Sequence, residues 1–151
     1  MSNKTAPQER ILPIVLGYWQ ARAIAVATEL GVPDLLAEGS LHVDALASRT
    51  NTDASAVFRL LRALESMGIF TQASPRIFSN TATSECLRKD VPGSQWPTVM
   101  HCLSKGSGPF EAWSELEYAM RTGGPSIKKT YGYDFWELLE RNPQASAINP
   151  I

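Results

Sequence analysis

Apolar residues recur at helical spacing between residues 8 and 30, in the stretch QERILPIVLGYWQARAIAVATEL. This spacing predicts a long helix, and Gly31 follows it as a C-cap. A solvated surface helix usually carries a clear polar stripe, but this segment holds few charges. The charged residues are Glu9, Arg10, Arg22 and Glu29. We therefore expect this helix either to be deeply buried or to pack against another chain.

The next pattern predicts a short helix that starts at Pro33 and ends at Gly39. Residues 41–68 then form a predicted helix-turn-helix unit, that is, two helices separated by a turn. Asp53 ends the turn Thr-Asn-Thr-Asp and is a residue type that caps helices well. The last helix has one apolar stripe, formed by Val57, Leu60, Leu61, Leu64 and Met67.

Two short strands are expected at residues 69–72 and 76–80, joined around Ser74 and Pro75. A helix-turn-helix followed by two such strands is a winged-helix arrangement. The predicted fold class is mostly α: a winged-helix-like helical bundle with a small two-stranded β-wing.

After the wing the pattern is again helical. We expect helices over residues 83–90, 94–106, 109–123 and 134–148, with a Gly-Pro loop over residues 123–133. We predict a single domain over residues 1–151, with a winged-helix core at about 11–90 and a helical extension at about 94–148.

The charge balance argues against nucleic acid as a partner. The chain has 14 Lys and Arg residues against 15 Asp and Glu, a net charge of -1. Proteins that bind DNA usually carry a basic surplus, because neutralisation of phosphates supplies much of the affinity. Arg59 and Arg62 are offset by Asp53 and Glu65, and the wing adds only Arg76. We expect these arginines to pair with nearby acids.

The composition is that of a globular protein, with 44% hydrophobic and 19% charged residues. Cys86 and Cys102 form no Cys-x-x-Cys pair, and His101 beside Cys102 lacks metal-ligand spacing. We expect all three to be half-buried helix residues. No signal-peptide pattern or run of 18 apolar residues occurs, so we expect a cytoplasmic protein with no membrane partner.

No catalytic set emerges from the residues alone. The Gly-x-Gly at residues 106–108 follows a predicted helix, whereas a nucleotide-binding glycine loop follows a buried strand. The histidines His42 and His101 have no partner at the spacing of a catalytic pair. Three carboxylates are interpreted as the solvated face of a helix: Glu111, Glu115 and Glu117. We assign no catalytic residue, cofactor-binding residue or metal ligand.

The C-terminal third is rich in aromatic residues: Phe110, Trp113, Tyr118, Tyr131, Tyr133, Phe135 and Trp136. Aromatic residues at helical spacing form a core in many proteins. Several of these flank the Gly-Pro loop, where they could instead line a site for a flat hydrophobic ligand. Both interpretations remain open at this point.

Four blocks together resemble the N-terminal region of S-adenosylmethionine-dependent O-methyltransferases, the family of caffeate, acetylserotonin, and bacterial polyketide and carotenoid methyltransferases. The blocks are ATELGVPDLLAEG, VDALASRTNTDASAVFRLLRALESMGIF, YAMRTGGPS and YGYDFWELLERNPQ. The resemblance runs from about residue 11 to residue 147. It implies a winged-helix-like dimerisation domain whose helices intertwine with those of a second copy and form part of the substrate pocket.

The same resemblance implies a homodimer and an aromatic small molecule as partners. Trp113, Met120, Tyr131 and Phe135 lie in or beside matching blocks and are the substrate-pocket candidates it implies. We keep two alternatives: a winged-helix transcription regulator, and a small dimeric ligand-binding protein.

Family members continue into a Rossmann-like domain with a glycine-rich cofactor loop and, in many members, a catalytic histidine. This chain reads Ser-Ala-Ile-Asn-Pro-Ile and stops, so the resemblance implies that it lacks that domain. We therefore expect no cofactor in this chain, S-adenosylmethionine being expected only for the missing domain. The implied function is the dimerisation and substrate-pocket domain of a small-molecule O-methyltransferase, truncated or stand-alone, that does not methylate by itself. A separate methyltransferase domain is then a further expected partner.

Overall fold

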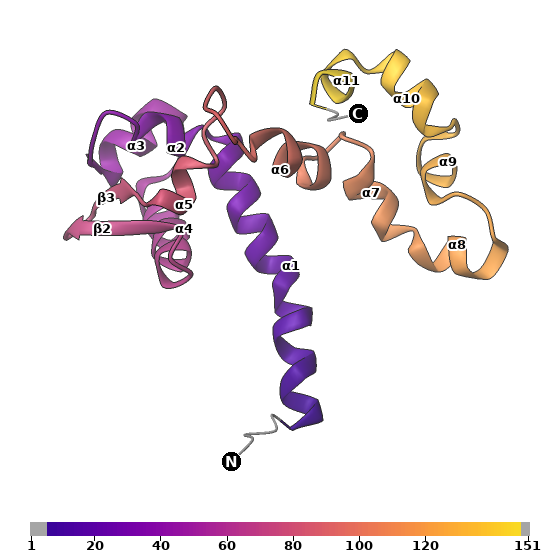
Figure 1. Cartoon of the computed structure of the whole chain (residues 1–151), viewed down its shortest axis with the longest axis horizontal. Helices are drawn as coiled ribbons and strands as arrows, with labels where there is room; N and C mark the ends of the chain where they lie inside the picture. Colours follow the sequence, from indigo (N-terminus) through magenta and orange to yellow (C-terminus); the bar gives the residue numbers. More distant parts are fainter. Residues whose placement is uncertain (1–5, 149–151) are drawn as a thin grey trace.

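The computed structural model describes residues 6–148, and most of this part of the chain is helical (Figure 1). The first helix, α1 (Pro7–Glu29), passes between two groups of elements. The winged-helix elements lie on one side of it and the C-terminal helices on the other, while its N-terminal half projects away from both (Figure 1).

Four short helices and a sheet form the winged-helix group. The helices are α2 (Val32–Leu35), α3 (Val43–Thr50), α4 (Ala54–Ser66) and α5 (Ala82–Glu85). The strands are β1 (Leu41–His42), β2 (Phe70–Ser74) and β3 (Ile77–Asn80), and they form an antiparallel sheet in the order β1-β3-β2. The prediction of a mostly α fold with a small β-wing is confirmed.

The predicted two-stranded wing is formed by β2 and β3, and the sheet contains a third strand, β1, that the sequence did not predict. Leu41 and His42 were assigned to a helix but pair with Phe78 and Ile77 of β3. Two residues are too few to show the alternation of a strand. In addition, His42 is the N-cap of α3, and its Nδ1 accepts a hydrogen bond from the Asp44 N–H at 3.3 Å.

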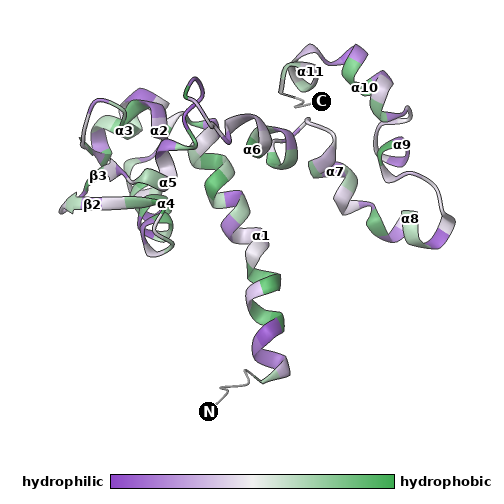
Figure 2. Cartoon of the chain, viewed as in Figure 1, coloured by the Kyte–Doolittle hydropathy of each residue, from purple (hydrophilic) through white to green (hydrophobic). Residues whose placement is uncertain are grey.

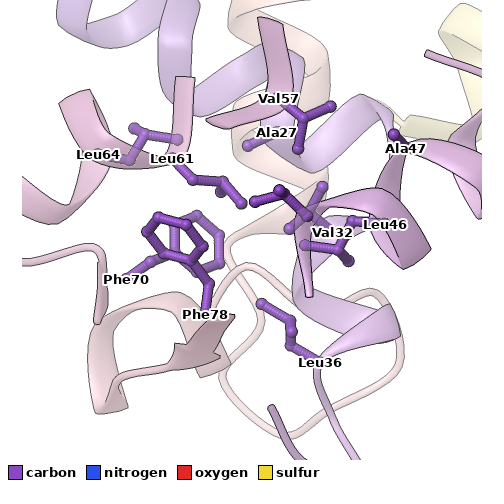
Figure 3. Packing of buried hydrophobic residues seen from close by; sticks show 11 residues of the cluster. Ala27, Val32, Leu36, Leu46, Ala47, Val57, Leu61, Leu64, Phe70 and Phe78 are labelled. Carbon is purple, nitrogen blue, oxygen red and sulfur yellow. The ribbon is translucent and has the colours of Figure 1, made fainter. Parts of the chain in front are cut away.

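The core lies between α1, α3, α4 and the sheet (Figure 3). Phe70 and Phe78 from the two long strands are 1% and 0% exposed, and they pack with Leu61 and Leu64 of α4. The remaining buried members are Ala27, Val32, Leu36, Val43, Leu46, Ala47 and Val57.

Helix α4 follows the sequence prediction closely. The Asp53 carboxylate accepts a hydrogen bond from the Ala56 N–H at 2.8 Å, which satisfies a free donor of the first turn. Val57, Leu61 and Leu64 are buried, whereas Leu60 and Met67 of the same stripe are partly buried against the core.

Helix α1 ends where the sequence predicts. Gly31 has φ +68°, the left-handed conformation that glycine adopts readily, and this turns the chain into α2. Only the C-terminal half packs into the core, through the buried residues Ala25, Ala27 and Thr28. By length and composition α1 could also cross a membrane; core helices of soluble proteins meet the same criterion.

Six further helices make up the extension as far as residue 148. They are α6 (Trp96–Leu103), α7 (Pro109–Ser114), α8 (Leu116–Thr122), α9 (Ser126–Tyr131), α10 (Phe135–Arg141) and α11 (Pro143–Ile148).

Three details differ from the prediction. The helix expected over residues 109–123 is interrupted at Glu115, and the one expected from residue 134 is interrupted at Asn142, directly before Pro143. The loop expected over residues 123–133 contains α9. Pro125 before this helix and Gly132 after it are ordinary start and stop signals. The Gly-Gly pair directly before Pro125 favoured the prediction of a loop, so this helix of six residues was missed.

The core predicts a large difference between two residues of α4. Leu61→Ala should lower the free energy of unfolding by about 2–5 kcal/mol, because Leu61 is 0% exposed and the site cannot collapse fully. Arg59→Ala, on the exposed side of the same helix, should change it by no more than about 0.5 kcal/mol. Urea unfolding at one fixed protein concentration measures both, and equal effects would contradict this core.

Candidate functional site

The N-terminal half of α1 carries a continuous exposed apolar surface, which we call the α1 face. Its members are Ile11, Leu12, Ile14, Val15, Tyr18 and Trp19, with exposed fractions of 59–74%. They recur at intervals of one, three and four residues, so they cover more than one narrow stripe. Figure 2 shows hydrophobic turns on the part of the helix that projects from the rest of the chain. Contiguous apolar surface of this kind marks an interaction site.

Further large apolar side chains are exposed on the extension. Trp113 of α7 and Met120 of α8 have exposed fractions of 70% and 74%, and Trp136 of α10 has 63%. Trp113 and Met120 were predicted as substrate-pocket residues. Their exposure is consistent with contact to a ligand or to another protein surface.

A groove of about 300 Å³ lies between α1 and the extension, and we call it the Trp113 groove. It is lined by Tyr18, Cys102, Leu103, Phe110, Trp113 and Ser114. Tyr18 also belongs to the α1 face, so the groove and the face are continuous. On its other side Trp113 lines a smaller hollow of about 140 Å³, with Leu116 and Ser126.

Arg22 fixes the geometry of this groove and was missed as a functional residue. Its guanidinium donates a hydrogen bond to the Leu103 carbonyl and lies 4.8 Å from the centre of the Phe110 ring. The carbonyls at the end of a helix lack partners within it, so Arg22 satisfies one at the end of α6 while packing on α7. The position of a charged residue within a largely apolar helix could have indicated that Arg22 has a structural role.

Tyr131 lies at the end of α9, where its hydroxyl donates a hydrogen bond to Glu111 Oε2 at 2.8 Å. Glu111 Oε1 accepts a second hydrogen bond, from the Gly106 N–H at 2.6 Å. Glu111 is therefore a structural acceptor that connects α7, α9 and the loop after α6, and its interpretation as part of a solvated face is wrong. An acidic residue in the first turn of a helix that follows a glycine loop could have indicated this role.

Burial raises the pKa of the Tyr131 phenol to about 12, with further contributions from the hydrogen bond and the negative charge of Glu111. The phenol is therefore a stable hydrogen-bond donor at neutral pH and is poorly suited to act as a base. Its ring also stacks on that of Tyr133, with centroids 6.0 Å apart.

Phe135 packs edge-on against His101, with ring centroids 6.2 Å apart, and against Trp136. The structure thus places the four predicted pocket residues in four different surroundings. Trp113 lines the grooves, Tyr131 holds Glu111, Phe135 packs on α6 and Met120 is exposed. Their contact with a substrate stays a prediction.

The glycine loop at residues 106–108 does not fit a nucleotide cofactor. Helix α6 precedes it, and the Gly106 N–H donates to a carboxylate, which would repel a phosphate. Gly108 has φ +103°, and a Cβ there would lie 2.5 Å from Leu138 Cδ2. This glycine is needed for the close packing of α10.

The thiols and imidazoles do not form a metal site. Among the described residues, no three His, Cys, Asp or Glu side chains gather closely enough to hold an ion. Cys86 and Cys102 are exposed free thiols, so the prediction that they are half-buried is wrong. His101 is half-buried, as predicted.

Arginines on the winged-helix surface contact groups of the chain itself. Arg76 forms an ion pair with Asp44 at 3.1 Å and lies 5.0 Å from the centre of the Phe58 ring. Arg62 lies 5.9 Å from the same ring. The predicted pairing with acids is confirmed for Arg76, whereas Arg62 stacks on an aromatic ring.

Comparison with known proteins identifies a consistent set of relatives. The family model for the O-methyltransferase dimerisation domain matches residues 12–90. Phenazine O-methyltransferase PhzM of Lysobacter antibioticus is 31% identical over 139 residues, covering 91% of this chain and 40% of the relative. Mitomycin biosynthesis 6-O-methyltransferase of Streptomyces lavendulae is 36% identical over 146 residues, covering 96% and 41%.

The solved structure of the mitomycin 7-O-methyltransferase MmcR superposes with a TM-score of 0.85 at 35% identity, over 93% of this chain and 41% of that one. The chain therefore spans about two fifths of the length of the curated relatives it matches. The described fold corresponds to their N-terminal region.

The Tyr131–Glu111 contact predicts an alkaline titration. The folded chain keeps this phenol protonated where the unfolded chain has lost the proton, so the stability it contributes is complete below pH 10 and is lost between about pH 10 and 12. Tyrosinate absorbance should show one of the four tyrosines titrating near pH 12.

Tyr131→Phe should remove this late step, and Tyr18→Phe should leave it in place. Glu111→Gln should move the step to lower pH, because it removes a negative charge and a charged acceptor. A late step that persists in Tyr131→Phe would show that another tyrosine is responsible.

Proposed function

The chain belongs to the O-methyltransferase dimerisation domain family, and from this premise we propose that it forms a homodimer through the α1 face. Six large apolar side chains in contact with water support the proposal. Burying one such side chain fully is worth about 1.5–3 kcal/mol, so the six together can offset the entropy lost on association. The projecting half of α1 lets a second copy contact it from several sides (Figure 1).

We further propose that the Trp113 groove is part of the wall that contacts a flat aromatic methyl acceptor. The groove is lined by Tyr18, Phe110 and Trp113, and it opens directly onto the α1 face. Relatives named for phenazine and mitomycin methylation carry out their activity with more than twice the length of this chain. The complete acceptor site would therefore include surfaces of a further domain, which would also hold S-adenosylmethionine.

We propose a cytoplasmic location. Two exposed free thiols suit a reducing compartment, and one relative is named as an enzyme of mitomycin biosynthesis.

Dimerisation is tested by light scattering after size exclusion. At micromolar concentration the chain should have a mass of about twice 16.6 kDa. Ile14→Glu combined with Trp19→Glu places two charges in the α1 face and should give a folded monomer, because neither side chain belongs to the core.

Gln20→Glu is the matched control, since it adds a charge at an exposed polar position of the same helix and should leave the dimer intact. Circular dichroism verifies the fold of each variant. A monomeric parent chain, or a double variant that dimerises as well as the parent, would contradict the proposal.

The aromatic wall is tested with phenazine as a neutral probe. The NMR signal of the Trp113 indole should shift on addition of phenazine, and Trp113→Ala should weaken binding by about five- to tenfold through loss of stacking. Trp136→Ala removes a ring of similar exposure outside the groove and should have little effect. If both variants weaken phenazine binding equally, phenazine binds to exposed aromatic rings in general and has no preference for the Trp113 groove.

A further inference from the structure

Helix α8 lies at the end of the extension farthest from the winged-helix elements (Figure 1), and none of its residues is buried. It is bounded by two hinges. Glu115 ends α7 and precedes α8, and its φ of −99° and ψ of 18° are not those of an α-helix. At the other end Gly123 has φ +72°, and Gly124 follows it. Because glycine has the widest choice of backbone conformations, rotation there can move α8 as a unit.

One face of α8 is apolar and exposed. Leu116 and Met120 are four positions apart, which places them on the same side of the helix, and both are exposed. Leu116 also lines the hollow of about 140 Å³, together with Trp113 of α7 and Ser126 of α9. The hollow therefore lies between three elements. Filling it with an apolar side chain of α8 adds dispersion contacts and removes apolar surface from water.

The opposite side of α8 is held by Tyr118. Lys129 Nζ of α9 lies 5.7 Å from the centre of the Tyr118 ring. A Cβ at Gly124 would lie 3.2 Å from Tyr118 Oη, so this close approach favours glycine. Thr122 Oγ1 donates to the Tyr118 carbonyl at 2.8 Å and accepts from the Gly124 N–H at 3.1 Å. We call these four residues the Tyr118 cluster. Thr122 and Lys129 are exposed, so water weakens the contacts of the cluster.

We propose that α8 moves between two positions and thereby changes the shape of the Trp113 groove. The open position is the one described above, held by the Tyr118 cluster. In the closed position α8 rotates about Glu115 and Gly123, Met120 packs on the Trp113 ring, and the hollow is filled. Closing buries apolar surface but gives up the contact between Lys129 and Tyr118. These two contributions are small and opposed, so both positions are populated.

Trp113 connects this movement to the groove. Its ring lines both the hollow and the Trp113 groove. A methionine sulfur packs favourably against an aromatic ring, so Met120 is a suitable partner for it. A Trp113 ring that is covered by Met120 presents a different surface to the groove. This consequence rests on the proposed function of the groove, whereas the movement itself depends on neither the groove nor the α1 face.

The test follows the Met120 methyl group and the Trp113 indole by NMR, in the whole chain without a ligand. Movements of short lids occur in microseconds to milliseconds. Relaxation dispersion should therefore detect one exchange process with the same rate at both groups. Trp113→Ala should remove the dispersion of the Met120 methyl signal, because it removes the ring on which the closed position depends.

Two pairs of variants test the Tyr118 cluster. Lys129→Gln should raise the ratio of closed to open positions about two- to fivefold, because it removes the cation from the Tyr118 ring. Lys128→Gln, at the neighbouring exposed position, is the matched control and should leave the ratio unchanged. Tyr118→Leu should have a larger effect than Lys129→Gln. Its control is Tyr133→Leu, since the Tyr133 ring also lies beside a cation, at 5.0 Å from Arg141 Cζ, but outside α8.

Absence of dispersion at Met120 in both the parent chain and Lys129→Gln would overturn the inference. So would equal responses to Lys129→Gln and Lys128→Gln. A sample mixed from two differently labelled preparations shows which chain supplies the contact. A nuclear Overhauser effect between Met120 of one copy and Trp113 of another would also overturn the inference, because the apolar face of α8 would then belong to an interface between copies.

The same measurement on the variant Ile14→Glu with Trp19→Glu separates this result from dimerisation. That variant should keep the dispersion at Met120, because the α1 face takes no part in the movement. A monomeric parent chain that shows the exchange contradicts only the proposed function. A dimer without the exchange contradicts only the movement of α8.

Discussion

The structure depends on one helix that meets two different environments. The C-terminal half of α1 has small buried residues, Ala25, Ala27 and Thr28, which allow the winged-helix elements to approach closely. The N-terminal half has the bulky α1 face, which the rest of the described chain leaves exposed. The apolar pattern continues along both halves of the helix, but the core of the described chain buries only the C-terminal part. The N-terminal part leaves apolar side chains exposed to water, which favours burial by association.

Polar contacts, more than a large core, join the extension to this helix. Arg22 satisfies a terminal carbonyl of α6 and packs on Phe110 of α7, and Glu111 holds both the Gly106 amide and the Tyr131 hydroxyl. Buried apolar residues of the described extension are few and include Leu138 and Ala145. Directional contacts of this kind fix orientation well, because each donor has one geometry that satisfies it. The Trp113 groove lies beside the Arg22 contacts, and its shape depends on them.

The sequence predicts the elements whose signals are local. The stripe of α4, its Asp53 cap and the end of α1 before Gly31 follow from spacing and residue type alone. Strand β1 and the role of Glu111 could not be predicted in this way. Leu41 pairs with Phe78, 37 positions along the chain, and Tyr131 bonds to Glu111 across 20 positions. Helical periodicity does not indicate which residues far apart in the sequence come into contact. The four pocket candidates were therefore identified from the family resemblance, and not from a prediction that they lie close together.

The charge distribution explains why α4 is not suited to bind DNA, although the fold has the shape of a winged helix. In a DNA-binding winged helix, the exposed arginines are available to phosphates and base edges. Here Arg76 is paired with Asp44, and both Arg62 and Arg76 lie against the Phe58 ring. Moving these two arginines to phosphate would break contacts that the fold already makes. Covering the α1 face breaks no contact and removes apolar surface from water. The contacts of Arg62 and Arg76 and the exposure of the α1 face therefore both favour the proposed association through α1 over DNA binding.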